Sequence, residues 1–239
     1  MKCLVTAGNT QVLIDKVRCI TNIFTGRTGA QIALELHRRG HVVTLLTSRP
    51  ESLTELQPGF TADSRLLVKE YQTFDDLHVM MEQGIHRQPL DVIVHSAAVS
   101  DYLSQGIYAT QPGSHFSTST LQFEGSSGPT MKDVAAGKVK SNYEELWLRF
   151  IKAPKLVDRI RRDWGFTGKL VKFKLEVGIT REQLQAIAEA SRLQSQADLM
   201  VANTLEGSRE WALLGPVHGK YVEITRQALA CKVVDALGR

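Results

Sequence analysis

The sequence predicts an α/β fold in which a Rossmann-like, mostly parallel sheet carries helices on both faces, with a long flap loop and a C-terminal hairpin. Short runs of β-branched residues alternate along the chain with segments of helical periodicity, an order typical of βαβ units. The 239 residues are 43% hydrophobic and 23% charged, close to the average for soluble globular proteins. We therefore expect a single domain over residues 1–239, with a core large enough to fold without a metal or disulfide.

The N-terminal half predicts four strands and two helices. A strand over residues 4–6 leads through a glycine-rich turn to a helix over 28–39, in which Ile32, Ala33 and Leu36 share one face. Gly40, which follows two arginines, marks the end of that helix. Further strands are expected at 41–46, 66–71 and 91–94, and the second helix at 74–85.

A long segment without periodicity interrupts the C-terminal half. Of the 18 residues 113–130, 11 are Gly, Ser or Thr. Such a loop inside a compact domain is usually a lid or disordered, so we expect a flexible lid at about residues 103–138. The alternation then resumes with helix 155–162, strand 170–173, helix 180–194, strand 199–201, a hairpin of 211–214 and 221–224, and a closing helix at 227–237.

Composition bounds the location and the partners. The formal charge of +4 comes without basic blocks, which argues against nucleic acid as a partner and suits a small anionic substrate equally well. No apolar run approaches the roughly 20 residues of a membrane span, and no signal peptide is visible, so a cytoplasmic protein without membrane association is expected. Cys3, Cys19 and Cys231 are odd in number and widely spaced, which favours a reducing compartment and argues against a structural zinc site.

Two predicted strand ends carry residues suited to a ligand. The first strand ends at Gly8, where backbone amides can approach a phosphate or carboxylate at a helix start, although a tight turn without a ligand explains this glycine equally well. After the fourth strand, Ala97 and Ala98 would let a substrate lie against the backbone. Asp101 can accept from a ribose or base, sit near a metal, or simply cap the next turn. His95, on an apolar strand, is more typical of a core histidine than of a catalyst.

Two further segments carry cations. Arg18 and Asn22 precede Gly26 and Gly29, so that a guanidinium fork for a phosphate and an amide for a carbonyl or oxyanion stand beside an anion-binding helix start. Alternatively, Arg18 pairs with Asp15 on the surface and Asn22 caps a turn. Lys138 and Lys140 point to one side of an extended segment, either over a triphosphate or as ordinary solvated charges. Residue spacing alone does not decide between the alternatives for either segment.

Eight motifs, in order, resemble the phosphopantothenoylcysteine synthetase family of coenzyme A biosynthesis, in a stand-alone form. The family patterns TAGGT, D-x-V-R, S-N-x-S-S-G-x-x-G and AAVADF resemble residues 6–10, 15–18, 21–29 and 97–102. Its K-I-K-K, K-T-P-D-I, G-F-x-x-E and A-D-x-I-V-A-N patterns resemble residues 138–141, 152–156, 172–176 and 197–203. The chain departs from these patterns at Asn9 and Lys172, where the family has glycine, and at Lys155, where it has aspartate. In bacterial members the helix before the last motif carries lysines, whereas here Arg192 is its only cation near that end.

This resemblance implies a ligase that joins 4′-phosphopantothenate and cysteine through an acyl-nucleotide, expected to be acyl-cytidylate. It also implies CTP or ATP as co-substrate, Mg²⁺ on the phosphates, no flavin, and a homodimer. Asn22 and Lys138 are the expected catalytic residues. The expected substrate-binding residues are Arg18, Asn22, Gly26, Ala97 and Ala98. The expected nucleotide-binding residues are Gly8, Ala97, Ala98, Asp101, Lys138, Lys140, Pro154, Lys155, Leu156, Val157, Phe173 and Arg192. The sequence predicts no particular metal ligands.

Two other classes of function are compatible with the same fold. A nicotinamide-dependent reductase shares the strand order, but the first turn lacks G-x-G-x-x-G, and Ser48-Arg49 stand where an acidic residue would be expected. A nucleotide-binding module without catalytic activity is the other alternative, because of the departures from the family patterns.

Overall fold

The computed structural model describes residues 1–61, 63–125 and 130–238. The chain divides into two compact units, each built from separate segments. The first unit consists of Met1–Thr10, Asn22–Val99 and Lys155–Arg239, and the second of Gln11–Thr21 and Ser100–Pro154.

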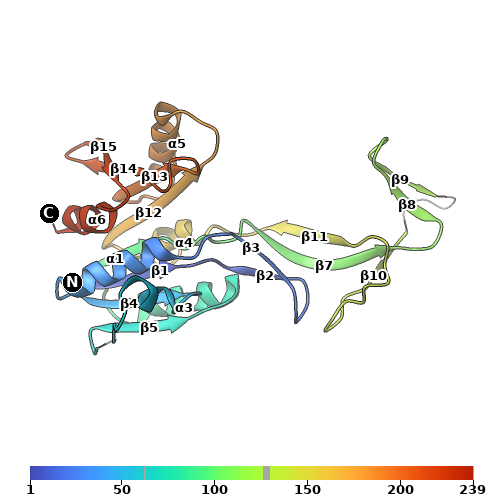
Figure 1. Ribbon diagram of the computed structural model, residues 1–239, viewed down its shortest axis with the longest axis horizontal. Coiled ribbons are helices and arrows are strands. Elements are labelled where there is room, and N and C mark those ends of the chain that lie inside the picture. The colour runs from blue at the N-terminus through green and yellow to red at the C-terminus, as the bar shows by residue number, and fades with distance from the viewer. Residues whose placement is uncertain (62, 126–129, 239) are drawn as a thin grey trace. The chain divides into compact units, whose positions relative to one another are not determined.

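The first unit is built on a sheet of eight strands in the order β15-β14-β13-β12-β6-β1-β4-β5 (Figure 1). The six strands from β13 to β5 are parallel, and β14 and β15 are antiparallel additions at one edge. Their order matches the doubly wound 3-2-1-4-5-6 arrangement and confirms the predicted fold class. The strands are β1 (Lys2–Ala7), β4 (Val42–Thr47), β5 (Leu66–Glu70), β6 (Val92–His95), β12 (Lys169–Glu176), β13 (Leu199–Thr204), β14 (Trp211–Val217) and β15 (Lys220–Thr225).

Helices cover both faces of this sheet. On one face, α1 (Arg27–Arg38), α2 (Ser52–Leu56) and α6 (Leu229–Leu237) pack on alternate residues of β1, β4 and β6, including Val5 and Val94. On the other face lie α3 (Phe74–Arg87), which packs on Leu4, and α5 (Arg181–Gln194), which packs on β13. The short α4 (Leu156–Arg162) contacts α3 through the 2.9 Å hydrogen bond between Arg159 and His78.

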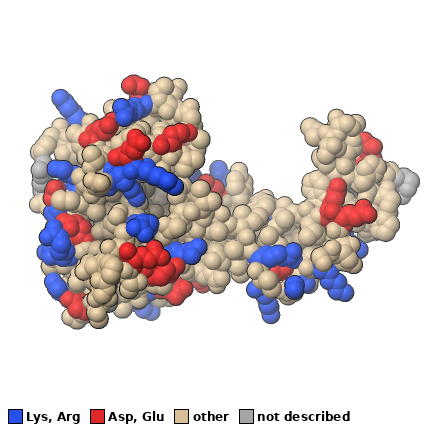
Figure 2. All heavy atoms as spheres, in the orientation of Figure 1, with Lys and Arg blue, Asp and Glu red and all other residues tan. Residues whose placement is uncertain are grey.

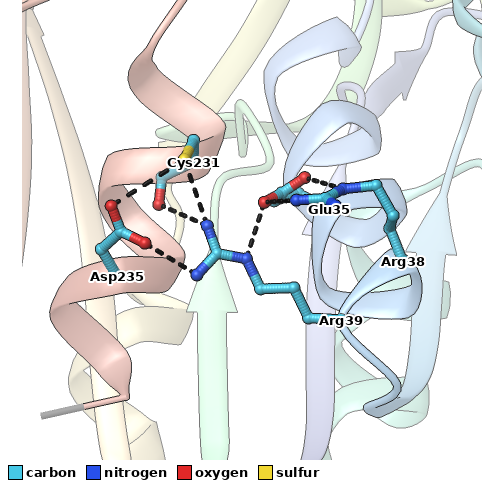
Figure 3. Close-up of polar contacts among 5 residues, drawn as sticks. All are labelled: Glu35, Arg38, Arg39, Cys231 and Asp235. Carbon is cyan, nitrogen blue, oxygen red and sulfur yellow. Dashed lines mark hydrogen bonds and ion pairs between the residues drawn. The ribbon is translucent and has the colours of Figure 1, made fainter.

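The first and last helices are joined by an arginine. Helices α1 and α6 lie side by side, and Figure 3 shows Arg39 between them. Its guanidinium donates to Glu35 at 2.6 Å and to Asp235 at 2.7 Å, and it lies beside Cys231. These bonds hold the C-terminal helix against the first βαβ unit. Of the described helices, none is long and apolar enough to cross a membrane.

The second unit is an antiparallel β structure. The hairpin of β2 (Gln11–Leu13) and β3 (Cys19–Thr21) accompanies a three-stranded sheet in the order β10-β7-β11 and a hairpin of β8 with β9. These strands span Tyr102–Thr110 (β7), Ser114–Ser117 (β8), Gln122–Gly125 (β9), Met131–Asp133 (β10) and Trp147–Lys152 (β11).

The prediction of an irregular segment over 113–130 was therefore wrong for the described part of it. Strands β8 and β9 form there because the rings of Phe116, Phe123 and Trp147 pack against one another in edge-on and tilted arrangements, with centroids 4.9–5.3 Å apart. Residues 126–129 of this segment lie outside the described residues. Mobility of a lid at about 103–138 stays a prediction.

In the first unit, the strands and the helices other than α2 agree with the predictions to within a few residues. Helix α2 and the β2–β3 hairpin were not predicted, because each is too short to show periodicity. Strands β7, β10 and β11 were not predicted either: β7 and β10 lie almost wholly within the segment expected to be a lid, and β11 lies between that segment and α4. The three cysteines are free. On the face drawn in Figure 2, basic and acidic side chains are interspersed over the larger, first unit.

Candidate functional site

A ligand crevice is expected where the strand order of an open parallel sheet reverses. In the first unit this point lies between β1 and β6, since the chain goes from β1 to β4 and β5 on one side before it returns to β6 on the other. Beyond the strand ends the two backbones stay joined, because Ala98 donates to the Gly8 carbonyl at 2.8 Å and Thr10 donates to the Ala98 carbonyl at 3.2 Å. The predicted residues Gly8, Ala97 and Ala98 thus share one edge of the sheet.

Glycines let the start of α1 touch the end of β1. Gly26 has a φ of 78°, and a Cβ on it would lie 2.4 Å from the Gly8 backbone nitrogen. A Cβ on Gly29 would lie 2.7 Å from the Cβ of Ala7. No other residue type fits either position without moving the backbone. The helix start is thereby held at the crevice, with its first N–H groups lacking intrahelical acceptors, as an anion-binding site requires.

The side chain of Asn9 fastens the loop that carries Asn22. Its Nδ2 donates to the Asn22 carbonyl at 2.6 Å and to the Phe24 carbonyl at 3.0 Å, and its Oδ1 accepts from Ser48 at 3.1 Å. Asn9 is only 2% exposed. From the sequence, Asn9 was expected only as a departure from a glycine motif, and no role was assigned to it. The one indication of a role was a polar side chain at a position where the family has glycine.

The side chain of Asn22 reaches the residues that follow β6. Its Nδ2 donates to the Ala98 carbonyl at 3.1 Å, which uses one of its two amide hydrogens. Within the described part of the chain, no other partner of this side chain is found. The second N–H and the carbonyl oxygen therefore remain available to a ligand, which is compatible with either predicted role for the amide.

His95 belongs to the core, in agreement with the interpretation of the sequence. The side chain is buried, and its Nδ1 forms a 3.0 Å hydrogen bond with the Thr6 hydroxyl, which also accepts from the Ala97 N–H at 3.1 Å. Burial, together with the nearby Lys172 ammonium, lowers the pKa of His95 to about 4. A neutral histidine therefore supports the backbone at Ala97, and it does so from beneath the crevice.

Lys172, next to His95 across the β6–β12 pair, is also buried. Its ammonium donates to the Ser191 carbonyl at 2.9 Å and to the Ser195 hydroxyl at 2.5 Å, and Ser195 donates to Asp158 at 2.6 Å. Burial is the main reason why the pKa of Lys172 falls to about 8. The lysine that stands in place of a family glycine thus ties β12 to α5 and, through Ser195, to α4.

In the second unit, Arg18 is bound to Asp15. Its guanidinium donates to Asp15 Oδ2 at 2.6 and 3.1 Å and to the Val139 carbonyl at 2.9 Å. Asp15 also accepts from the Val139 N–H at 3.0 Å, and the Arg18 guanidinium holds the pKa of Asp15 well below its usual range. The ion pair of the alternative interpretation is therefore present. It brings Arg18 next to the segment that carries Lys138 and Lys140, both of them exposed on either side of buried Val139.

The other predicted residues lie outside these clusters. Asp101 is exposed and its carbonyl accepts from Ala153 at 2.8 Å, one residue before Pro154. Arg192 is engaged with Glu189 at 2.6 Å and with the Ala197 carbonyl. Lys155 caps α4, Leu156 and Val157 are buried in it, and Phe173 packs partly against the core. The exposed side chain of Lys155 could therefore contact a nucleotide, whereas Leu156 and Val157 could do so only through their backbone atoms.

Comparisons with known proteins agree on one family. The family model described as the DNA/pantothenate metabolism flavoprotein C-terminal domain matches residues 1–124. The chain is 29% identical over 241 residues to the coenzyme A biosynthesis bifunctional protein CoaBC of Thermococcus kodakarensis. The match covers 99% of this chain and 50% of that protein. The chain spans about half the length of the curated relatives it matches.

Solved structures show the same fold. The crystal structure of the DNA/pantothenate metabolism flavoprotein from Streptococcus pneumoniae is 25% identical, with a TM-score of 0.76, and the match covers 100% of this chain and 98% of that one. A Cab2 mutant in complex with phosphopantothenate-cysteine is 17% identical, with a TM-score of 0.70 and coverage of 100% and 85%. This second likeness bears on the fold alone.

Proposed function

Because the chain belongs to the DNA/pantothenate metabolism flavoprotein C-terminal domain family, we propose that it is a phosphopantothenate–cysteine ligase, acting in coenzyme A biosynthesis. The observation that carries this proposal is the Asn9–Asn22–Ala98 arrangement at the crevice of the first unit. It holds the Asn22 amide, one of whose N–H groups has no partner among the described residues, beside the backbone of Ala98. The eight ordered motifs support the same reaction.

The chemistry divides into two steps. A carboxylate oxygen of 4′-phosphopantothenate attacks the α-phosphorus of CTP or ATP, and pyrophosphate leaves with the electrons of the broken P–O bond. The amine of cysteine then attacks the acyl carbon of this mixed anhydride. Nucleoside monophosphate leaves as the amide forms and the amine loses a proton. Neither step needs a nucleophilic side chain, so positioning and charge stabilisation are the tasks left to the protein.

Residues of each unit are suited to different parts of this reaction. In the first unit, Asn22 would donate to the acyl oxygen as it becomes an oxyanion. In the second unit, exposed Lys138 and Lys140 would supply point charges for the phosphates. One guanidinium nitrogen of Arg18 has no partner among the described residues and would bind the phosphate of phosphopantothenate.

Mg²⁺ fits this proposal as an ion carried by the phosphates. Among the described residues, no three His, Cys, Asp or Glu side chains lie close enough together to hold a metal ion. Mg²⁺ characteristically keeps several waters and binds through substrate phosphates with one or two carboxylates, so it needs no preformed cage. When bound, it would neutralise charge on the triphosphate.

The test is product formation from defined mixtures. The protein is incubated with Mg²⁺, 4′-phosphopantothenate, cysteine and either CTP or ATP, and products are identified by mass spectrometry. We expect phosphopantothenoylcysteine, nucleoside monophosphate and pyrophosphate in equal amounts, with one nucleotide clearly preferred. Pantothenate without its phosphate should react poorly. Absence of the amide product with both nucleotides would contradict the proposal.

A further inference from the structure

Arg226 is a partly buried cation for which the described part of the chain supplies no carboxylate partner. Among the described residues, every other arginine either forms an ion pair or is exposed to solvent. The guanidinium of Arg226 donates to the Thr28 hydroxyl of α1, and that is its one side-chain hydrogen bond within the described chain. Burial without a compensating negative charge lowers the pKa of Arg226.

The position of Arg226 is at the ligand edge of the sheet. Strand β15 runs parallel to β13, since each is antiparallel to β14, so the residue after β15 lies at the carboxyl edge. That edge carries the ends of β1 and β6 and the start of α1, where Thr28 is located. The backbone of Arg226 is fixed there by its N–H bond to the Glu210 carbonyl, 2.8 Å long.

Its free donors can reach a ligand. The described part of the chain has a single fully buried side-chain nitrogen or oxygen without a partner, and it belongs to Arg159. The unpartnered guanidinium nitrogens of Arg226 are therefore open to solvent. In the first turn of α1 no acidic side chain neutralises the helix start, and Arg27 is already paired with Glu55 at 3.3 Å. A partly desolvated charge without a counter-charge carries a free-energy cost, which an anion bound to it would offset.

We propose that Arg226 is an anion-binding residue, which holds a phosphate group of a phosphorylated substrate beside the start of α1. A guanidinium offers two parallel donors to phosphate oxygens, and the neighbouring Thr28 hydroxyl keeps the fork in place. The inference deepens the proposed function and rests on it for the identity of the substrate. The phosphate belongs either to the nucleoside triphosphate or to 4′-phosphopantothenate.

Equilibrium binding separates these two sources. Inorganic pyrophosphate, CTP, 4′-phosphopantothenate and pantothenate are titrated into the wild-type protein, Arg226→Gln, Arg226→Lys and the control Arg209→Gln. Arg209 is an exposed arginine in the β13–β14 connection at the same sheet edge, so its variant makes the same change of charge. We expect Arg226→Gln to weaken pyrophosphate and one substrate about 10- to 100-fold, the effect of losing a charge-assisted bond.

The pattern of losses identifies the ligand. Loss of CTP affinity assigns Arg226 to the nucleotide phosphates, whereas loss for 4′-phosphopantothenate but not pantothenate assigns it to the 4′-phosphate. Arg226→Lys should retain part of the affinity, and Arg209→Gln should stay within about twofold of wild type, because exposed charges contribute little. Equal affinities in Arg226→Gln and Arg209→Gln, or no binding of any phosphate compound to the wild type, would overturn the inference.

A second measurement uses the unaltered protein. Phenylglyoxal modifies accessible arginines, and mass spectrometry gives the rate at each site. Pyrophosphate should slow modification at Arg226 and leave Arg209 unaffected; equal rates with and without pyrophosphate would contradict the proposal. If pyrophosphate protects Arg226 although no ligation occurs, the proposed function fails and the anion site stands. If ligation occurs but pyrophosphate does not protect Arg226, the proposed function stands and the anion site fails.

Discussion

At the residue scale, two asparagine side chains connect the loop of residues 22–24 to the ends of β1 and β6. Asn9 fastens the backbone at Asn22, and Asn22 reaches across to Ala98. The sequence predicted the glycine turn and the core position of His95, because both follow from local residue types. It did not predict the role of Asn9, since that role exists only when residues 22–24 return to the end of β1.

Asn22→Asp tests the catalytic role of this amide. The exchange keeps the shape but places a negative charge where an oxyanion is proposed to form. Loss of one such donor typically costs about 10²–10³ in rate, and amide formation with cysteine should fall at least this much. The first step should suffer less, because attack on phosphorus develops no charge on the acyl oxygen. Acyl-nucleotide should therefore accumulate once per site.

Single-turnover quench measurements of pyrophosphate and of the amide product distinguish the two steps. Asn142→Asp, the same exchange at an exposed position of the second unit, is the control and should leave both rates unchanged. A parallel fall in both steps, in a variant with a wild-type melting profile, would make Asn22 a general binding or structural residue.

The lowered pKa of Lys172 predicts that the free energy of unfolding depends on pH. Its pKa is about 8 in the folded protein against 10.5 for a free lysine, so the unfolded chain binds more protons between these values. The free energy of unfolding should rise with pH across this window, by at most about 1.4 kcal/mol per pH unit. Lys172→Met lacks the amine and should lack this slope. Urea unfolding of both proteins from pH 7.5 to 10.5 measures it, and a constant difference between them would exclude the effect.

At the element scale, the βαβ alternation of the first unit could be predicted and the hairpins of the second could not. Apolar periodicity marks α1, α3 and α5 because each buries one face on the sheet. Strands β8 and β9 are short, half-exposed and rich in polar residues, and their pairing depends on Trp147 about thirty residues further along. Contacts between distant segments leave no local pattern to detect.

Asp15 is predicted to hold the lysine segment in the second unit. It accepts from Arg18, Val17 and Val139, so its charge joins the 15–18 turn to residues 137–139. Asp15→Asn should raise amide hydrogen exchange at Val139 by roughly tenfold or more, because a buried charge-assisted contact is lost. Asp63→Asn, which alters an exposed ion pair in the first unit, should leave that exchange unchanged. Equal protection in both variants would show that other contacts hold the segment.

At the scale of the whole molecule, the family and the doubly wound sheet could be predicted, whereas the two-unit division could not. The order of the motifs and the alternation of strands with helices can be read along the linear chain. The second unit combines residues 11–21 with 100–154, and the composition of neither segment indicates that the two associate. The predicted site residues are accordingly shared between the units, with Asn22 and Ala98 in the first and Arg18 and Lys138 in the second.

Detection of the acyl-nucleotide is the most direct test of the proposed ligase. The protein, at a concentration comparable to that of the nucleotide, is mixed with 4′-phosphopantothenate, Mg²⁺ and CTP or ATP without cysteine, and quenched for mass spectrometry. We expect one pyrophosphate per site together with a phosphopantothenoyl-nucleotide adduct, and a cysteine chase should convert this adduct to amide and nucleoside monophosphate. Release of inorganic phosphate and nucleoside diphosphate in place of pyrophosphate, or no adduct with either nucleotide, would contradict it.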